Sequence, residues 1–71
     1  MGVPKRLTEM QKRFCQYLVF GGPEGPVNKA EAAELAGYSV KRARQEGAEL
    51  TNPRQSPLVV KYKDELEQDA L

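Results

Sequence analysis

The chain has 71 residues and a net charge of +1, with no histidine and a single cysteine. This length has room for one small domain, whose hydrophobic core is marginal without a partner or an oligomer. The nearly balanced net charge argues against a protein that binds any polyanion. The composition excludes an intramolecular disulfide and the usual zinc sites, and no apolar run could span a membrane, so we expect an intracellular, reduced protein without metal or cofactor.

The charge is distributed unevenly along the chain, which is basic at its start and acidic at its end. Residues 1–7 form a short basic arm that contains Pro4, Lys5 and Arg6. We expect this arm to be flexible, because no apolar pattern begins before Thr8.

Residues 8–20 are predicted to form the first helix. Thr8 is a suitable N-cap and Gln11 stands three residues later, the spacing of a capping box. Apolar side chains then recur at helical spacing, which indicates a core-facing stripe. The stripe comprises Met10, Phe14, Tyr17 and Leu18. Cys15 lies beside it, and we interpret this residue as a small, partly buried filler rather than a nucleophile.

The segment at residues 21–27, GGPEGPV, cannot continue a helix. Its glycines invite comparison with phosphate-binding loops, but neither a Gly-Lys-Ser/Thr sequence nor a preceding strand is present. We therefore expect a linker.

Residues 28–37 and 39–51 have the pattern of two short helices joined by a tight turn. Asn28 can cap the first of them together with Glu31, and alanine-rich sequence sustains it. Gly37 suits the left-handed C-terminal position, and Ser39 can cap the next helix. This arrangement predicts a helix-turn-helix, in which the second helix recognises DNA.

A helical wheel divides the recognition helix into two sides. The predicted buried side consists of Val40, Ala43, Gly47 and Leu50. Lys41, Arg42, Gln45 and Glu49 project away from it, with Arg44 on the near flank, and the small Ala48 permits close approach to a surface.

These polar residue types suit a nucleic-acid ligand. Lysine and arginine bind phosphate oxygens and guanine edges, and glutamine matches adenine. The candidate DNA-binding residues are therefore Lys5, Arg6, Ser39, Lys41, Arg42, Arg44 and Gln45. The alternative is a solvated amphipathic helix with scattered charges.

Residues 56–69 are predicted to form a fourth helix, after a break at Thr51, Asn52 and Pro53. Ser56 is a suitable N-cap and Pro57 a suitable first helical residue. An apolar stripe of Leu58, Tyr62 and Leu66, with Val59 beside it, must dock either on the core or on a partner. The acidic residues Asp64, Glu65, Glu67 and Asp69 are interpreted as a solvated face. The predicted fold is all-α, a small domain of about four helices that spans residues 1–71 and contains a helix-turn-helix.

Several of these segments resemble the N-terminal DNA-binding domain of phage terminase small subunits. The resemblance rests on LTEMQKRF at residues 7–14, Tyr17, NKAEAA at 28–33, AGYS at 36–39, Ala43-Arg44, Gly47, Leu50 and Thr51-Asn52-Pro53. It covers about two thirds of the chain, from Leu7 to Pro53. The chain departs from the family in its longer loop at 21–27 and in an insertion at 54–57.

The resemblance implies a role in viral genome packaging. Terminase small subunits recognise packaging-site DNA, assemble as rings and present the DNA to a large subunit that carries the ATPase and nuclease. The chain itself is then not an enzyme, and it acts in the cytoplasm of the infected bacterial host. In this family pattern Ala32, Ala33, Gly37 and Tyr38 match the helix-turn-helix scaffold, while Lys41, Arg42 and Arg44 fall at the start of the recognition helix.

Two other functions fit the same residues. The first is a transcriptional or recombination factor that has the same motif but no link to packaging. The second is a helical protein-interaction module without DNA binding, whose Leu58, Tyr62 and Leu66 stripe docks on a partner helix.

Overall fold

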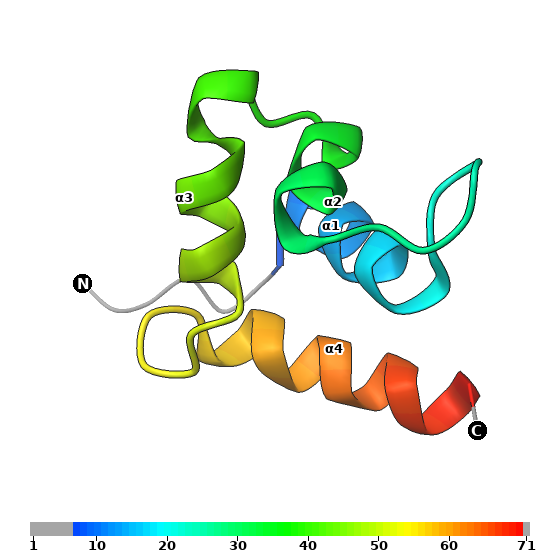
Figure 1. The fold of residues 1–71 in the computed structure, drawn as a ribbon. Coiled ribbons are helices and arrows are strands. Elements are labelled where there is room, and N and C mark those ends of the chain that lie inside the picture. The colour runs from blue at the N-terminus through cyan, green and yellow to red at the C-terminus, as the bar shows by residue number, and fades with distance from the viewer. Residues whose placement is uncertain (1–6, 71) are drawn as a thin grey trace.

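A computed structural model describes residues 7–70, which form four helices (Figure 1). These are α1 (Glu9–Phe20), α2 (Lys29–Ala36), α3 (Val40–Leu50) and α4 (Pro57–Ala70). The described residues contain no β-strand, only an isolated bridge between Gly22 and Gly25 in the loop after α1. The prediction of an all-α fold with four helices is confirmed. Lys5 and Arg6, both candidate DNA contacts, lie outside the described residues.

Local hydrogen bonds set the starts of the first two helices at the predicted residues. Thr8 Oγ1 accepts from the Gln11 amide at 3.1 Å, and Gln11 Oε1 accepts from the Thr8 amide at 2.9 Å. Asn28 and Glu31 form the same reciprocal pair before α2, at 2.8 and 3.1 Å. Each capping box satisfies two amides that have no partner within the helix.

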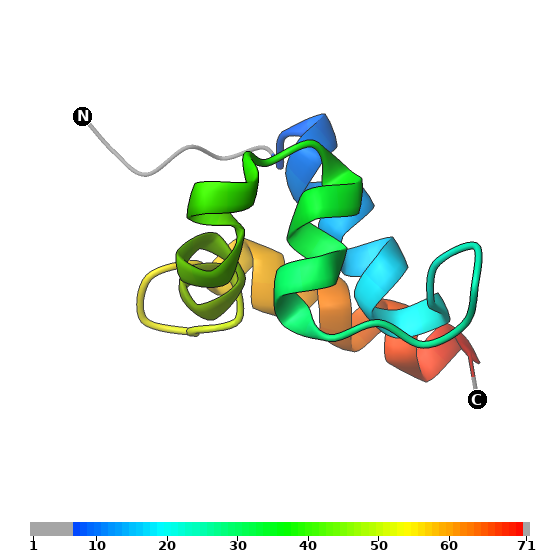
Figure 2. The ribbon, with the colours of Figure 1, turned by 45° about the horizontal axis from the view of Figure 1, so that its top comes forward.

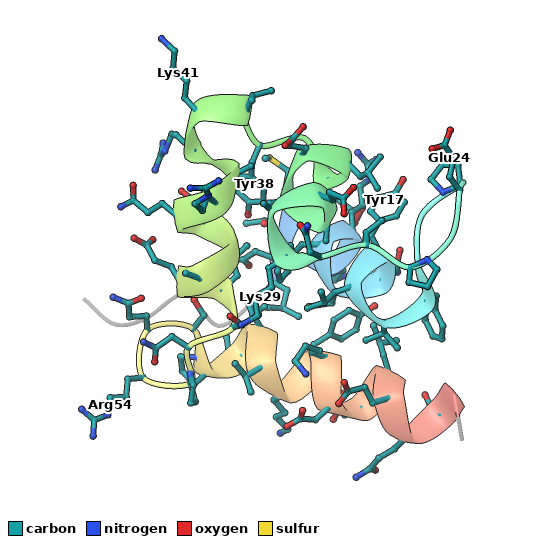
Figure 3. The ribbon with its side chains drawn as sticks, in the orientation of Figure 1. Tyr17, Glu24, Lys29, Tyr38, Lys41 and Arg54 are labelled. Atoms are coloured by element: carbon teal, nitrogen blue, oxygen red, sulfur yellow. The ribbon has the colours of Figure 1, made fainter. Side chains whose placement is uncertain are left out.

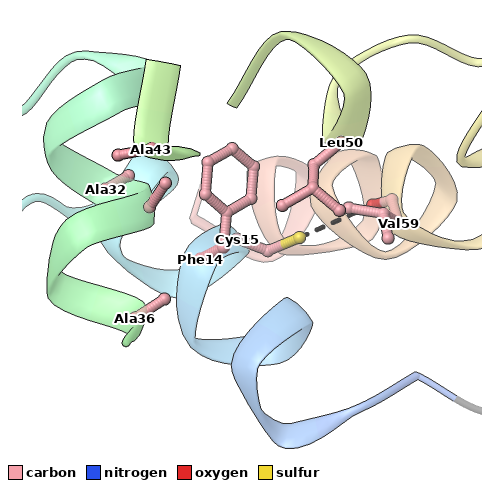
Figure 4. Close-up of a cluster of buried hydrophobic side chains, with 8 residues drawn as sticks. Phe14, Cys15, Ala32, Ala36, Ala43, Leu50 and Val59 are labelled. Atoms are coloured by element: carbon pink, nitrogen blue, oxygen red, sulfur yellow. Dashed lines mark hydrogen bonds between the residues drawn. The ribbon is translucent and has the colours of Figure 1, made fainter. Parts of the chain in front are cut away.

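All four helices contribute to one small hydrophobic core (Figure 4). Phe14 is its largest fully buried side chain, and most of its neighbours are small. The buried set is Phe14, Cys15, Ala32, Ala33, Ala36, Ala43, Leu50 and Val59. Because alanine side chains are short, the helices that carry them can approach the Phe14 ring closely.

The contact between α2 and α3 is close enough to exclude a side chain at Gly47. A Cβ atom on Gly47 would lie 2.9 Å from the backbone oxygen of Lys29. The two helices are inclined to each other: in Figure 1 α3 is seen from the side and α2 nearly along its axis, and Figure 2 reverses this. The first turn of α2 therefore rests directly on the third turn of α3.

The fourth helix packs on the core of the domain through α1, as Figure 1 shows. Val59 is buried, and Tyr62 and Leu66 are half-buried against the core. The Cys15 thiol donates a weak hydrogen bond to the Val59 carbonyl oxygen at 3.6 Å. Docking on the core is thus the alternative that the structure supports for Tyr62 and Leu66, whereas Leu58, also placed in the stripe, is not among the side chains packed on the core. Cys15 is fully rather than partly buried.

We expect Gly47→Ala to lower the free energy of unfolding by about 1–3 kcal/mol, because the added methyl group must displace the Lys29 backbone. Helix propensity alone has the opposite sign, since alanine is favoured over glycine by about 1 kcal/mol. Chemical denaturation measures the change in the free energy of unfolding, and its sign shows which of the two effects is larger. Ala48→Gly, at an exposed neighbouring position, is the control and should cost only about 1 kcal/mol. A stabilised Gly47→Ala variant would contradict the close contact.

The buried thiol predicts a pH dependence of stability. Burial raises the pKa of Cys15 from about 9.0 to about 11, and the nearby Lys63 opposes this only in part. Because the pKa is higher in the folded state, the stabilisation is complete below pH 9 and is lost as pH rises through 11. Wild type should lose on the order of 2 kcal/mol more than Cys15→Ala over this interval. Urea denaturation in a reducing buffer measures both curves, and parallel curves would contradict the prediction.

Candidate nucleic-acid interface

The turn between α2 and α3 is held by backbone hydrogen bonds around Gly37. Gly37 has a φ of +118°, and its amide donates to the Glu34 carbonyl oxygen at 3.1 Å. The Tyr38 amide donates to the Ala33 carbonyl oxygen at 3.0 Å. This pair of bonds is a Schellman motif, which needs a residue that tolerates the left-handed conformation. The chain can therefore leave α2 and begin α3 within three residues.

Ser39 and Tyr38 then fix the start of α3. The Ser39 hydroxyl accepts from the Arg42 amide at 3.3 Å, so this predicted DNA contact is the N-cap of the helix. Tyr38 is half-buried against the core. Burial raises the pKa of its hydroxyl, and the neighbouring Glu46 and Cys15 raise it further. The phenol consequently stays neutral and packs the turn onto the domain.

The outer side of α3 is exposed along its length. Ala43, Gly47 and Leu50 are buried, as predicted, whereas Lys41, Arg44, Gln45 and Ala48 are exposed. Figure 3 shows Lys41 projecting beyond the first turn of the helix. Neither Lys41 nor Arg44 forms an ion pair with a carboxylate of residues 7–70. Both cations are therefore available to an anionic ligand.

The prediction that Val40 belongs to the buried side is wrong. Val40 is 75 % exposed, and it belongs neither to the buried core nor to the partly buried hydrophobic residues packed against it. On the helical wheel Val40 continues the line of Ala43 and Gly47. However, α2 ends at Ala36, and none of the described residues 7–70 buries this side of α3 at its first turn.

Two other candidate residues are engaged by carboxylates one turn further along α3. Arg42 Nη2 lies 2.7 Å from Glu46 Oε2, and Gln45 Nε2 donates to Glu49 Oε2 at 3.0 Å. The Arg42 side chain is nevertheless 70 % exposed. The Glu46 side chain is only 14 % exposed, so the Arg42–Glu46 pair is partly shielded from water. Helix pairs at this spacing contribute about 0.3–0.5 kcal/mol when exposed, so a phosphate or a base edge can still compete for Arg42 and Gln45.

The structure adds two cations that the sequence analysis did not single out. Lys29, at the start of α2, lies with Arg44 along one shallow hollow, which is also lined by Leu18, Asn28, Ala30 and Ala48. Arg54 projects from the loop after α3 (Figure 3), and its amide donates to Asn52 Oδ1 at 2.9 Å. The sequence gives no signal for Lys29, because its place beside α3 depends on the packing of α2 at Gly47.

The described residues hold no other feature of a chemical site. No group of three or more potential metal ligands occurs within residues 7–70. No helix in this range is both long and apolar enough to cross a bilayer. The acidic side chains of α4 are exposed, and Lys63 pairs with Asp64 at 3.8 Å and with Glu67 at 3.2 Å.

The chain is similar to a known protein family over almost its whole length. A family model described as terminase small subunit matches residues 7–70. The match includes α4 and the segment at 54–57, and so extends beyond the motifs between Leu7 and Pro53. No curated protein and no solved structure matches the chain significantly.

The exposure of the α3 cations predicts that their removal leaves the fold intact. Arg44→Ala should change the free energy of unfolding by less than about 0.5 kcal/mol. Arg42→Ala should cost about 1 kcal/mol at low salt, because the Glu46 side chain, only 14 % exposed, loses its partner. This cost should shrink at high salt, since the Arg42 side of the pair is exposed and screened. Denaturation at two salt concentrations measures both effects. A large loss for Arg44→Ala would show that this side chain supports the fold instead.

Proposed function

Since the chain belongs to the terminase small subunit family, the non-catalytic component of terminase, we propose that it recognises viral packaging-site DNA through α3. In this proposal it presents the bound DNA to a separate large subunit that supplies the ATPase and nuclease activities. It acts in the cytoplasm of the infected bacterial host, where Cys15 stays a reduced thiol.

The observation that carries the proposal is the exposed basic side of α3. Lys41 and Arg44 are exposed and unpaired within residues 7–70, and Lys29 lines the same shallow hollow as Arg44. Arg54 projects from the loop after α3 (Figure 3). Glutamates on α3 lie mainly to one flank, where Glu46 pairs with Arg42. A positive surface centred on one projecting helix matches the charge and the shape of a DNA major groove.

Each side chain has a chemical role in this arrangement. The N-terminal residues of a recognition helix meet the base edges, while flanking cations bind phosphate. We assign Lys41 and Lys29 to phosphate contacts and Arg44 to guanine. Arg42 and Gln45 reach guanine and adenine after leaving Glu46 and Glu49, and Ser39 acts through the helix cap that it forms.

The basic arm extends the proposed contact surface. Lys5 and Arg6 lie outside the described residues, and the proposal for them rests on their charge and their place before α1. Contacts to phosphate would raise affinity for any sequence and steepen its salt dependence.

Assembly of several copies is the proposed source of useful affinity. A single α3 offers few base contacts, so one copy binds weakly. Copies held in a ring place several recognition helices along one DNA molecule, and each bound copy raises the effective concentration of DNA at the next. The DNA either wraps around the ring or passes through it.

We expect the double variant Lys41→Ala, Arg44→Ala to bind packaging-region duplex at least about tenfold more weakly at moderate salt. Its salt dependence should also flatten, because fewer counterions are released. Fluorescence anisotropy at several salt concentrations measures both. The double variant Arg13→Ala, Lys61→Ala is a matched control, since it removes two exposed cations that lie on α1 and α4 instead of on α3. Equal losses for the control and the α3 double variant would contradict recognition by α3.

The same measurements distinguish the alternative functions. A protein-interaction module would bind no duplex, and its α4 stripe is already largely used by the core. A transcriptional or recombination factor would bind DNA without affecting a terminase large subunit. Stimulation of large-subunit nuclease activity on packaging-region DNA, lost in the α3 double variant, would support the packaging role.

A further inference from the structure

We propose that Val40 is a specificity-determining residue that contacts the 5-methyl group of a thymine in the major groove. This inference rests on the proposed function and adds to it the recognition of one base, thymine. Val40 is the most exposed of the large apolar side chains in the described residues, at 75 % against 59 % for Phe20 and 41 % for Leu35.

The position of Val40 on α3 favours a contact with DNA. It is the first residue of the helix, directly after the Ser39 cap. Arg44 lies one turn further on the same side, and Lys41 is adjacent in sequence; both are exposed. A duplex bound by Arg44 would therefore come close to the valine side chain as well.

The chemistry of valine matches one base. In the major groove only thymine presents a methyl group, whereas the other bases present hydrogen-bonding edges or a C–H group. Valine in a helix keeps mainly one χ1 rotamer, so its two methyl groups hold a fixed direction and lose little entropy on contact. Contact between the methyl groups of valine and of thymine buries apolar surface, and this favours thymine at that position.

Within the described residues, Val40 has no packing role in the core. The residue is absent from the buried cluster and from the half-buried side chains packed against it. Truncation should consequently leave stability unchanged, and variants at this position can report on recognition alone.

The experiment compares thymine with uracil, which lacks only the methyl group. Wild-type protein first selects a duplex from a random-sequence library, and the selected site is then synthesised with uracil at one thymine position at a time. Wild type should lose about fourfold in affinity at one position, the effect expected for one buried methyl group. Val40→Ala should bind the two duplexes equally, and Val40→Thr, which keeps one methyl group, should show an intermediate ratio.

Lys41→Ala provides the matched control. It should weaken binding to both duplexes and retain the fourfold ratio, because it removes a phosphate contact without touching the methyl group. A Val40→Ala protein that still discriminates thymine from uracil, or a selected site without a sensitive thymine, would overturn the inference while leaving DNA recognition intact. Failure of wild type to select or bind any duplex would instead overturn the proposed function.

Discussion

The close approach of α2 and α3 at Gly47 is the constraint on which the rest of the molecule depends. The Lys29 backbone occupies the space that a side chain at position 47 would need. This contact, together with the left-handed turn at Gly37, sets the inclination of α3. It also brings Lys29 beside Arg44, so a single packing contact both builds the helix-turn-helix and assembles part of its basic surface.

The core shows how a chain of this size can hold that arrangement. Its buried residues are mostly small, and Phe14 is the one large ring among them. Helix α4 completes the core with Val59, Tyr62 and Leu66, which would otherwise be exposed. A small domain buries a limited fraction of its surface, so this additional helix is a substantial part of its stability. The stripe on α4 is therefore explained by folding, without a partner.

The side chains of α3 proposed to bind DNA divide into two groups with different consequences for binding. Arg42 and Gln45 are held by carboxylates on their own helix, whereas Lys41 and Arg44 have no such partner within residues 7–70. DNA contacts by the first group must break an existing interaction, which moderates affinity. Contacts by the second group carry no such cost. This division suits a subunit whose individual copies bind weakly and act together.

The sequence by itself determined the starts of α1, α2 and α3 and the end of α2, because a capping side chain or a C-terminal glycine acts within a few residues of the chain. It also indicated the family. The tertiary structure alone decided that Val40 is exposed, that Lys29 lies beside Arg44 and that α4 docks on α1. A helical wheel gives the side of a helix on which a residue lies. Burial additionally depends on where the neighbouring helix ends, and that is set by contacts between residues distant in sequence.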